Sequence, residues 1–204
     1  MKHFYIFDLD GTLCDSMGFW RDETDHIAPE QYSDPLIAEP AYDKMREHYR
    51  NDVQLKPGVI EFLERSRELG IHMCIASATR RDVSEPFLVR SGLLDFMEFY
   101  IDCWEVGAFK ERPDIYLQSA ARLGASVSDC AVFEDAEYCA LTAQRAGFFV
   151  VGINDKIAES EGANTDVCAS ATKRSTRCRT PKAEGETRRF CDVFVNNWYE
   201  LTNV

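Results

Sequence analysis

Residues 7–13 read FDLDGTL and follow the apolar, strand-prone residues 3–6, which read HFYI. A β-strand is therefore expected to end at Phe7, directly before two aspartates, Asp8 and Asp10. Carboxylates placed this close repel each other, and each is costly to remove from water. The pattern favours a metal cation bound at the end of this strand, because a cation would compensate both charges.

Strand-like and helix-like segments alternate through most of the chain. Near-continuous apolar strands are typical of a parallel sheet covered on both faces. Together with the intervening helical patterns, they favour a doubly wound, Rossmann-like α/β core. The expected strands are residues 3–7, 72–78, 96–103, 129–135 and 148–153, and the expected helices are residues 59–70, 82–95, 113–124 and 137–147.

One segment interrupts this alternation between the first expected strand and the rest of the sheet. Its pattern is mostly helical but broken by Pro29, Pro35 and Pro40, which favours one long helix, a loop and a second helix near residues 41–50. The expected division is an α/β core of residues 1–14 and 57–204 with a small helical cap of residues 15–56.

Residues 156–190 are polar and lack apolar periodicity. Between residues 170 and 190, seven basic and two acidic residues give a local charge of +5. This composition favours an exposed excursion, and it leaves open a basic docking patch for an acidic partner. Order is expected to return at residues 191–201, as a short strand and a closing turn or helix.

The 204 residues, 45% hydrophobic and 28% charged, fit one globular domain with a full core and a small insert. A net charge of −12 argues against a general nucleic-acid or membrane-surface binder. No stretch approaches the roughly 18 apolar residues of a membrane span. Early acidic residues disfavour a signal peptide, so a cytoplasmic protein is expected, with its eight cysteines reduced and mostly buried.

Side chains that could bind metal or phosphate follow four separate strands. In an open α/β sheet, ligands bind outside the carboxyl ends of the strands, so these side chains are expected to converge. In chain order they are Asp8 and Asp10, then Ser77, Ala78 and Thr79, then Lys110, then Glu134 and Asp135.

The chemistry of this set is coherent. Mg²⁺ prefers oxygen ligands, which Asp8, Asp10 and Asp135 could supply. A phosphate could then meet the metal, the Ser77 hydroxyl and the Lys110 ammonium. A carboxylate beside such a site can attack phosphorus and form an aspartyl-phosphate, while a second carboxylate protonates the leaving oxygen and later activates water.

These segments resemble, in order, the four motifs of the haloacid dehalogenase-like hydrolases, and mostly the subgroup of β-phosphoglucomutase and phosphoglycolate phosphatase. The likeness spans roughly residues 1–153. Residues 56–70, KPGVIEFLERSRELG, resemble the return of that family to its core. The motif segments are FDLDGTL (7–13), IASATR (75–80), Lys110 with residues 113–124, and VFEDAEYCALTAQRAG (132–147).

The resemblance implies a role for each motif residue, and it places residues 15–56 where the family inserts a mobile helical cap. Asp8 would be the nucleophile and a magnesium ligand. Asp10 would be the general acid/base, with its backbone carbonyl on the metal. The remaining implied roles are phosphate binding for Ser77, Ala78 and Lys110, magnesium binding for Asp135, and support of these ligands for Glu134.

The chain departs from the family pattern in several places. The third motif reads KERPD at residues 110–114 where the family often has Lys-Pro-x-Pro-Asp, and Cys139 stands where a glycine is common. Sugar-phosphate mutases of the subgroup carry a cap histidine where this chain has Trp20, and a cap arginine for a second phosphate. Arg46 and Arg50 are available for that contact. The cap is short, which favours simple hydrolysis.

The resemblance and these departures lead to an expected function. It is magnesium-dependent hydrolysis of a small phosphorylated metabolite of the sugar phosphate, phosphoglycolate or nucleotide type. Asp10 distinguishes this activity from haloacid dehalogenation, which needs neither a metal nor an acid there. Trp20 and Arg50 are candidates for substrate specificity, although Trp20 could equally belong to the core of the cap. A phosphosugar mutase, a non-catalytic member of the fold and a phosphoprotein phosphatase stay open, as does the oligomeric state.

Overall fold

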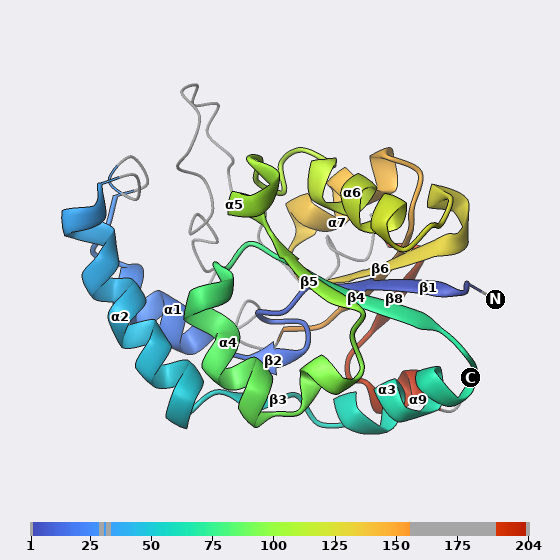
Figure 1. Cartoon of the computed structure of the whole chain (residues 1–204), viewed down its shortest axis with the longest axis horizontal. Coiled ribbons are helices and arrows are strands. Elements are labelled where there is room, and N and C mark those ends of the chain that lie inside the picture. The colour runs from blue at the N-terminus through green and yellow to red at the C-terminus, as the bar shows by residue number, and fades with distance from the viewer. Residues whose placement is uncertain (1, 29–30, 32–33, 156–190, 203–204) are drawn as a thin grey trace.

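The computed structural model describes residues 2–28, 31, 34–155 and 191–202. Its main strands are β1 (Phe4–Phe7), β4 (His72–Ser77), β5 (Phe99–Asp102), β6 (Cys130–Glu134), β7 (Phe149–Ile153) and β8 (Val193–Val195). Within the described residues they form a six-stranded parallel sheet in the order β5-β4-β1-β6-β7-β8 (Figure 1). The expected doubly wound α/β core is therefore confirmed.

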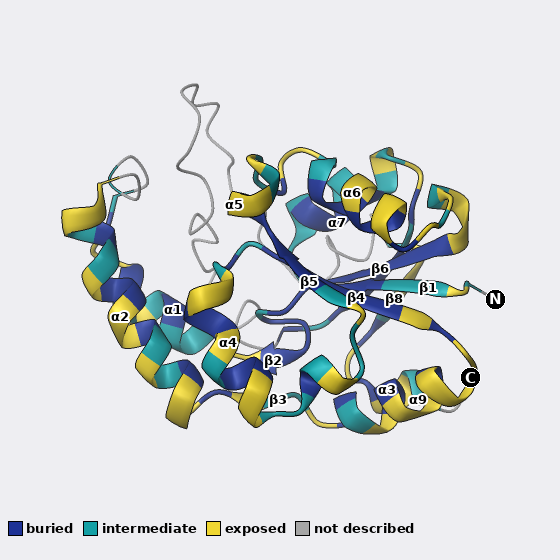
Figure 2. Cartoon of the chain, in the orientation of Figure 1, coloured by how far each residue is buried: buried dark blue, intermediate teal, exposed yellow. Residues whose placement is uncertain are grey.

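Helices lie on both faces of this sheet (Figure 1). The core helices are α3 (Val59–Glu68), α4 (Arg81–Arg90), α5 (Cys103–Val106), α6 (Asp114–Arg122), α7 (Glu137–Arg145) and α9 (Tyr199–Thr202). The insert helices α1 (Met17–Thr24) and α2 (Pro35–Asn51) lie beyond one end of the sheet (Figure 1). Successive residues of β1 point to opposite faces, as strand geometry requires. Ile6 packs in one cluster with Tyr116 of α6, and Phe7 packs in the other with Phe62 of α3. Both faces of the strands are thus buried (Figure 2), which accounts for their continuous apolar sequence.

The helical insert leaves and re-enters the core through a short ribbon. Its strands, β2 (Cys14–Asp15) and β3 (Gln54–Leu55), pair antiparallel with each other. This ribbon was not expected, because strands of two residues are too short to give a periodic signal. The expected helix lengths were wrong: α1 is the short helix, and α2 is the long one.

The position of two prolines explains why α2 is longer than expected. Pro35 lies in the first turn, where its missing amide costs nothing, and the Asp34 side chain accepts a hydrogen bond from the Leu36 amide at 3.0 Å. The missing amide of Pro40 would have bonded to the carbonyl of Leu36. Since Leu36 is 87% exposed, water can replace that bond.

The insert shares its apolar core with the rest of the protein. Helix α2 packs along α4. Trp20 of α1 and Tyr42 and Tyr49 of α2 belong to the same buried cluster as Phe87 of α4. The division into a separate core and cap therefore stays a prediction.

The last described segment returns to the sheet as expected, with β8 beside β7 and α9 after it. Trp198, between them, is fully buried and stacks on Phe133 at a centroid distance of 5.6 Å. Its Nε1 donates a hydrogen bond to the Thr12 carbonyl at 3.1 Å. The segment thus supports the loop that follows β1. The basic residues 170–190 lie outside the described part of the chain.

Two expectations about composition can be compared with the described residues. No helix among them is long and apolar enough to cross a membrane. No disulfide joins their cysteines, and burial is confirmed for Cys14, Cys74, Cys103, Cys130 and Cys139. Cys168 and Cys178 lie outside the described residues.

Replacing Trp198 by alanine is expected to destabilise the fold by about 3–5 kcal/mol, because it empties a large buried site and removes the bond to Thr12. Urea unfolding followed by circular dichroism measures this loss. Trp104→Ala is the matched control, since that ring is 46% exposed, and its cost should stay below about 1.5 kcal/mol. Equal losses in the two variants would contradict a special role for Trp198.

Candidate functional site

The carboxyl ends of β1, β4 and β6 lie side by side. Phe7 is in register with Ile75 on one neighbouring strand and with Phe133 on the other. The Asp8 amide continues this pairing by donating to the Phe133 carbonyl at 3.0 Å. Asp8 therefore emerges beside Ser77 and Glu134. Strands β4 and β5 lie on one side of β1, and the later strands β6, β7 and β8 lie on the other. The carboxyl end of β1 is therefore the topological switch point, the place at which open α/β sheets bind ligands.

Lys110 lies between two carboxylates at this edge. Its Nζ contacts Asp8 Oδ1 at 2.5 Å and Glu134 Oε1 at 2.7 Å, although the residue is only 1% exposed. The Tyr116 hydroxyl donates to the same Glu134 oxygen at 2.6 Å. The expected convergence of Asp8, Lys110 and Glu134 is thus present in the structure.

Burial and charge oppose each other in this group. Burial alone would lower the pKa of Lys110, but the Asp8 and Glu134 carboxylates raise it well above its usual value. Burial raises the pKa of Asp8, and it raises the pKa of Glu134 to about 7, although the Lys110 charge lowers both. One ammonium therefore compensates only part of the negative charge that the strand ends bring together.

Asp135 approaches the loop after β1 very closely. The Thr12 hydroxyl donates to its Oδ1 at 3.0 Å. Gly11 has φ +80°, and a Cβ at that position would lie 2.3 Å from Asp135 Oδ2. Glycine is required here on both grounds. Burial, followed by the charge of Asp8, raises the pKa of Asp135 well above its usual value.

The donor set at this edge fits a hard divalent cation. Among the described residues, Asp8, Glu134 and Asp135 each offer an oxygen, and these atoms lie within 4.8 Å of one another. Three carboxylates and one ammonium leave two negative charges if all are ionised. Asp8, which also accepts from Lys110, and Asp135 could hold such a cation with Glu134 beside them, and oxygen donors suit Mg²⁺.

The Asp10 side chain belongs to a different set of contacts. Its Oδ1 accepts from Ser16 Oγ at 2.5 Å and from the Tyr49 hydroxyl, and its Oδ2 accepts from Thr79 Oγ1 at 2.7 Å. The Trp20 Nε1 donates to the Tyr49 hydroxyl oxygen at 2.9 Å. Sequence reasoning missed Ser16 and Tyr49, because Tyr49 lies 39 residues from Asp10 in an insert that gives no motif.

The remaining predicted phosphate-binding residues lie at the end of β4. Ser77 is fully buried, and its Oγ accepts from the Thr79 amide at 2.9 Å, which forms a tight turn. Ala78 within this turn is partly exposed. Both residues therefore reach the edge at which Asp8 emerges, as expected.

A second lysine, Lys56, also contacts the loop after β1, and sequence reasoning missed it. Lys56 Nζ donates to the Gly11 carbonyl and lies 3.3 Å from Asp155 Oδ1. Asp155 follows β7 and is buried. Lys56 begins the KPGV segment (56–59), so its position after the insert was the available signal.

The two specificity candidates lie in different surroundings. Trp20 is buried in the shared cluster, and its indole N–H contacts the Tyr49 hydroxyl, which in turn contacts Asp10. The Arg50 side chain is 60% exposed and pairs with Glu47 at 3.6 Å. The structure does not bring Arg50 to the strand ends through any contact of the described residues, and a specificity role for either residue stays a prediction.

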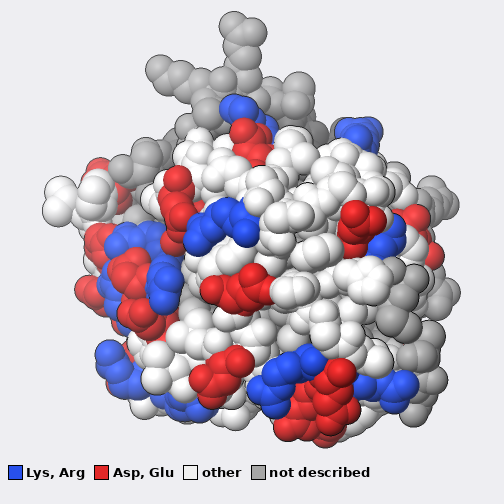
Figure 3. Space-filling model, turned by 45° about the vertical axis from the view of Figure 1, so that its right-hand side comes forward, with Lys and Arg blue, Asp and Glu red and all other residues white. Residues whose placement is uncertain are grey.

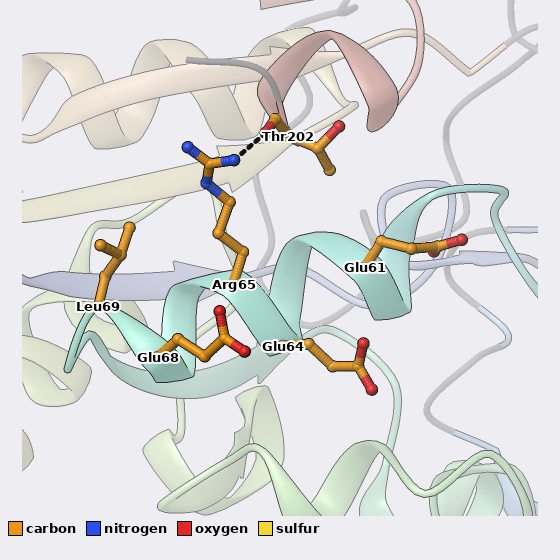
Figure 4. Close-up of a pocket in the computed structure, with 6 residues that line it drawn as sticks. All are labelled: Glu61, Glu64, Arg65, Glu68, Leu69 and Thr202. Carbon is orange, nitrogen blue, oxygen red and sulfur yellow. Dashed lines mark hydrogen bonds between the residues drawn. The ribbon is translucent and has the colours of Figure 1, made fainter.

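Two surface features lie away from the strand ends among the described residues. The face in Figure 3 carries acidic and basic side chains in small mixed groups. A hollow over α3, shown in Figure 4, is bounded by Glu61, Glu64, Arg65, Glu68, Leu69 and Thr202. Arg65 donates to the Thr202 carbonyl at 2.7 Å across it. This contact holds α9 against α3. None of Asp8, Lys110, Glu134 and Asp135 lines the hollow.

A parallel α/β sheet with a helical insert after its first strand, and with a lysine–carboxylate group at the switch point, defines a class of ligand-binding α/β enzymes. A model of the haloacid dehalogenase-like hydrolase family matches residues 19–147. The chain therefore belongs to that family, and the resemblance seen in the four motifs is confirmed.

Curated relatives include proteins of several activities. β-Phosphoglucomutase of Bacillus subtilis is 33% identical over 99 residues, covering 48% of this chain and 43% of the mutase. A haloacid dehalogenase-like hydrolase domain-containing protein of Arabidopsis thaliana, At4g39970, is 29% identical over 65% of this chain and 45% of its own. Both matches span less than two thirds of the relative. Hexitol phosphatase A of Escherichia coli is 26% identical, over 74% of this chain and 82% of the phosphatase.

Solved structures share the whole fold. A hydrolase from Pseudomonas syringae superposes with a TM-score of 0.71 at 22% identity, covering 100% of this chain and 97% of that one. CbbY from Rhodobacter sphaeroides, solved with phosphate, gives 0.70 at 16% identity, with 98% and 96% covered. At these identities the likeness shows the fold alone.

Replacing Lys110 by methionine is expected to destabilise the protein by about 3–5 kcal/mol at neutral pH, because Asp8 and Glu134 lose the cation between them. Without that charge the pKa of both carboxyls rises further in the native state, so the native state binds more protons than the unfolded one. The loss of stability should therefore grow as pH rises from 5 to 8.

Chemical unfolding across that pH range measures the effect of Lys110→Met. Lys44→Met is the control, because Lys44 is an exposed lysine paired with Glu23, and it should cost no more than about 1 kcal/mol. A loss that is the same at pH 5 and pH 8 would contradict the electrostatic origin.

Proposed function

We propose that this protein is a magnesium-dependent phosphatase that hydrolyses a small phosphorylated metabolite. The observation that carries the proposal is the convergence of Asp8, Lys110, Glu134 and Asp135 at the switch point. Family membership and the named phosphatases among the relatives support it. The family shares a fold rather than one substrate, so the residues at this edge have to define the reaction.

Asp8 is the proposed nucleophile. One of its carboxylate oxygens attacks phosphorus and forms an aspartyl-phosphate, while the bond between phosphorus and the ester oxygen breaks. Asp10 gives its proton to that leaving oxygen, then accepts a proton from the water that attacks the aspartyl-phosphate. The second attack releases inorganic phosphate and returns Asp8 to its carboxylate.

The other residues bind and orient the phosphate. Lys110 neutralises Asp8 and the incoming phosphate, and Ser77 and Ala78 contribute a hydroxyl and a backbone amide at the end of β4. Asp8, Asp135 and the backbone carbonyl of Asp10 would hold Mg²⁺, with Glu134 beside them. When bound, the metal supplies positive charge that stabilises the negative phosphate oxygens.

A sugar phosphate is the favoured substrate class within this proposal. Relatives named for such substrates are hexitol phosphatase A and fructose-1-phosphate phosphatase YqaB, both of Escherichia coli. Another relative is named validoxylamine A 7′-phosphate phosphatase, from Streptomyces hygroscopicus. Residues 15–56 would form the cap that contacts the leaving group. A cytoplasmic location, no nucleic-acid partner and no membrane partner remain expectations from the sequence.

A phosphosugar mutase is the second candidate, because β-phosphoglucomutase is among the relatives. A mutase needs cations for a second phosphate. Of the two insert arginines considered for this role, Arg46 contacts Asp82 at 2.5 Å and also Asp43 and Glu39. Arg50 pairs with Glu47 on the surface. These ion pairs favour hydrolysis over mutase activity.

The decisive test is phosphate release from sugar phosphates, nucleotides, phosphoglycolate and phosphopeptides, with Mg²⁺ and with EDTA. Wild-type protein should release phosphate only with Mg²⁺, and Asp8→Asn should lose at least about 10³-fold in rate because the nucleophile is gone. Asp22→Asn, at an exposed aspartate paired with Arg21, should match the wild type. Conversion of the substrate without phosphate release would favour the mutase, and an inactive wild type would reject both enzymes.

Metal binding can be tested without activity. Saturating Mg²⁺ should stabilise the wild type by about 1–3 kcal/mol, which raises the melting temperature by several degrees. Asp135→Asn should lose most of that shift, because it removes a proposed ligand. Scanning calorimetry with Mg²⁺ and with EDTA measures the shift, and an undiminished shift in Asp135→Asn would exclude the metal from this site.

A further inference from the structure

Three hydroxyl groups hold the Asp10 carboxyl group. Ser16, directly before α1, and Thr79, two residues after β4, both donate to it. Tyr49 is the third donor, and it comes from the long insert helix α2. Because both carboxyl oxygens are engaged, the side chain is fixed in rotation as well as in position.

The Tyr49 hydroxyl has a defined direction. The indole Nε1 of Trp20 is a donor only, and it donates to the Tyr49 oxygen at 2.9 Å. The phenol proton is therefore directed toward Asp10 Oδ1. Tyr49 is fully buried, and burial, followed by the charge of Asp10, raises the pKa of Tyr49 well above its usual value. The phenol thus keeps the proton that it donates.

The backbone of Tyr49 is anchored as well. The guanidinium of Arg90, at the end of α4, donates to the Tyr49 carbonyl at 3.2 Å and also to the Val53 carbonyl. These bonds satisfy carbonyls at the end of α2. The ring lies against Phe87 of α4 at a centroid distance of 6.3 Å. Helix α4 and Trp20 thus determine where the phenol meets Asp10.

We infer that Tyr49, directed by Trp20, is a positioning residue that holds Asp10 for proton transfer to the leaving group. The inference rests on the proposed function, in which Asp10 is the general acid/base. In that step the Asp10 proton moves to the ester oxygen as the bond to phosphorus breaks, and the bonding electron pair stays on that oxygen. A carboxyl group displaced by a fraction of an ångström transfers this proton poorly.

The leaving group distinguishes this role from a purely structural one. Nitrophenolate leaves as a stable anion, so hydrolysis of p-nitrophenyl phosphate depends little on a general acid. An alkyl alkoxide is a poor leaving group and needs the proton. Loss of the Tyr49 hydroxyl should therefore slow the alkyl phosphate far more than the aryl phosphate, whereas general damage to the site would slow both alike.

The experiment compares kcat and KM of wild type and Tyr49→Phe on p-nitrophenyl phosphate and on the best alkyl phosphate of the panel above. The ratio of kcat/KM for the alkyl substrate to kcat/KM for the aryl substrate should fall about tenfold, the upper range for one lost hydrogen bond. This ratio is used because kcat/KM reports formation of the aspartyl-phosphate, the step that protonates the leaving group, whereas hydrolysis of the aspartyl-phosphate is common to both substrates. Trp20→Phe, which removes the directing N–H together with part of the buried indole ring, should shift the ratio in the same direction by a smaller factor.

Tyr42→Phe is the matched control, because Tyr42 lies on the same helix and also packs on Trp20, at 6.1 Å. Its ratio should equal that of the wild type. Equal losses of kcat/KM on both substrates in Tyr49→Phe, which would leave the ratio unchanged, would overturn the inference while leaving the phosphatase intact. If Tyr49→Phe does not fold, an unchanged ratio in Trp20→Phe overturns it. A wild type inactive on every substrate would instead reject the proposed function.

Discussion

The ammonium of Lys110, buried between Asp8 and Glu134, is the contact on which the geometry of the strand ends depends. Parallel strands deliver these carboxylates to neighbouring positions, where both are almost fully buried. Burying a lysine and two acids costs several kcal/mol per ion before their attraction is counted, and apolar residues of the same size would often be as stable. Stability therefore does not explain the group, whereas the proposed binding of a phosphate and a cation would.

The loop that follows β1 is held by contacts with residues from several distant parts of the chain. Lys110 meets Asp8, three hydroxyls meet Asp10, and Lys56 meets the carbonyl of Gly11. Thr12 is bound twice, because its side chain donates to Asp135 and its carbonyl accepts from Trp198. Four of the five positions of the DLDGT sequence thus contact residues from other parts of the chain. This explains why so short a motif carries so much information, since a change at one position leaves a partner elsewhere unsatisfied.

Periodic and local features were predictable from the sequence, and contacts between distant segments were not. The five strands and the motif residues were found because continuous apolar runs and acids at strand ends are visible in short windows. The ribbon of β2 and β3 has no such signal at two residues per strand, and Pro40 suggested a break in α2 that an exposed first turn tolerates. The bond between Tyr49 and Asp10 depends on how α2 packs along α4, which no local pattern encodes.

Neighbouring turns of helix α2 make two different kinds of contact, a hydrogen bond to Asp10 and ion pairs with surrounding acids. Tyr49 faces Asp10, and Arg46 faces the carboxylates of Asp82 and Glu39. Arg80, beside the β4 turn, contacts the same two acids. A second phosphate bound by these arginines would have to displace carboxylates that already neutralise them. Hydrolysis needs only one phosphate, a proton donor for the leaving oxygen and water. The side of the site formed by α2 is therefore suited to proton transfer, and its ion pairs serve to place the helix that carries Tyr49.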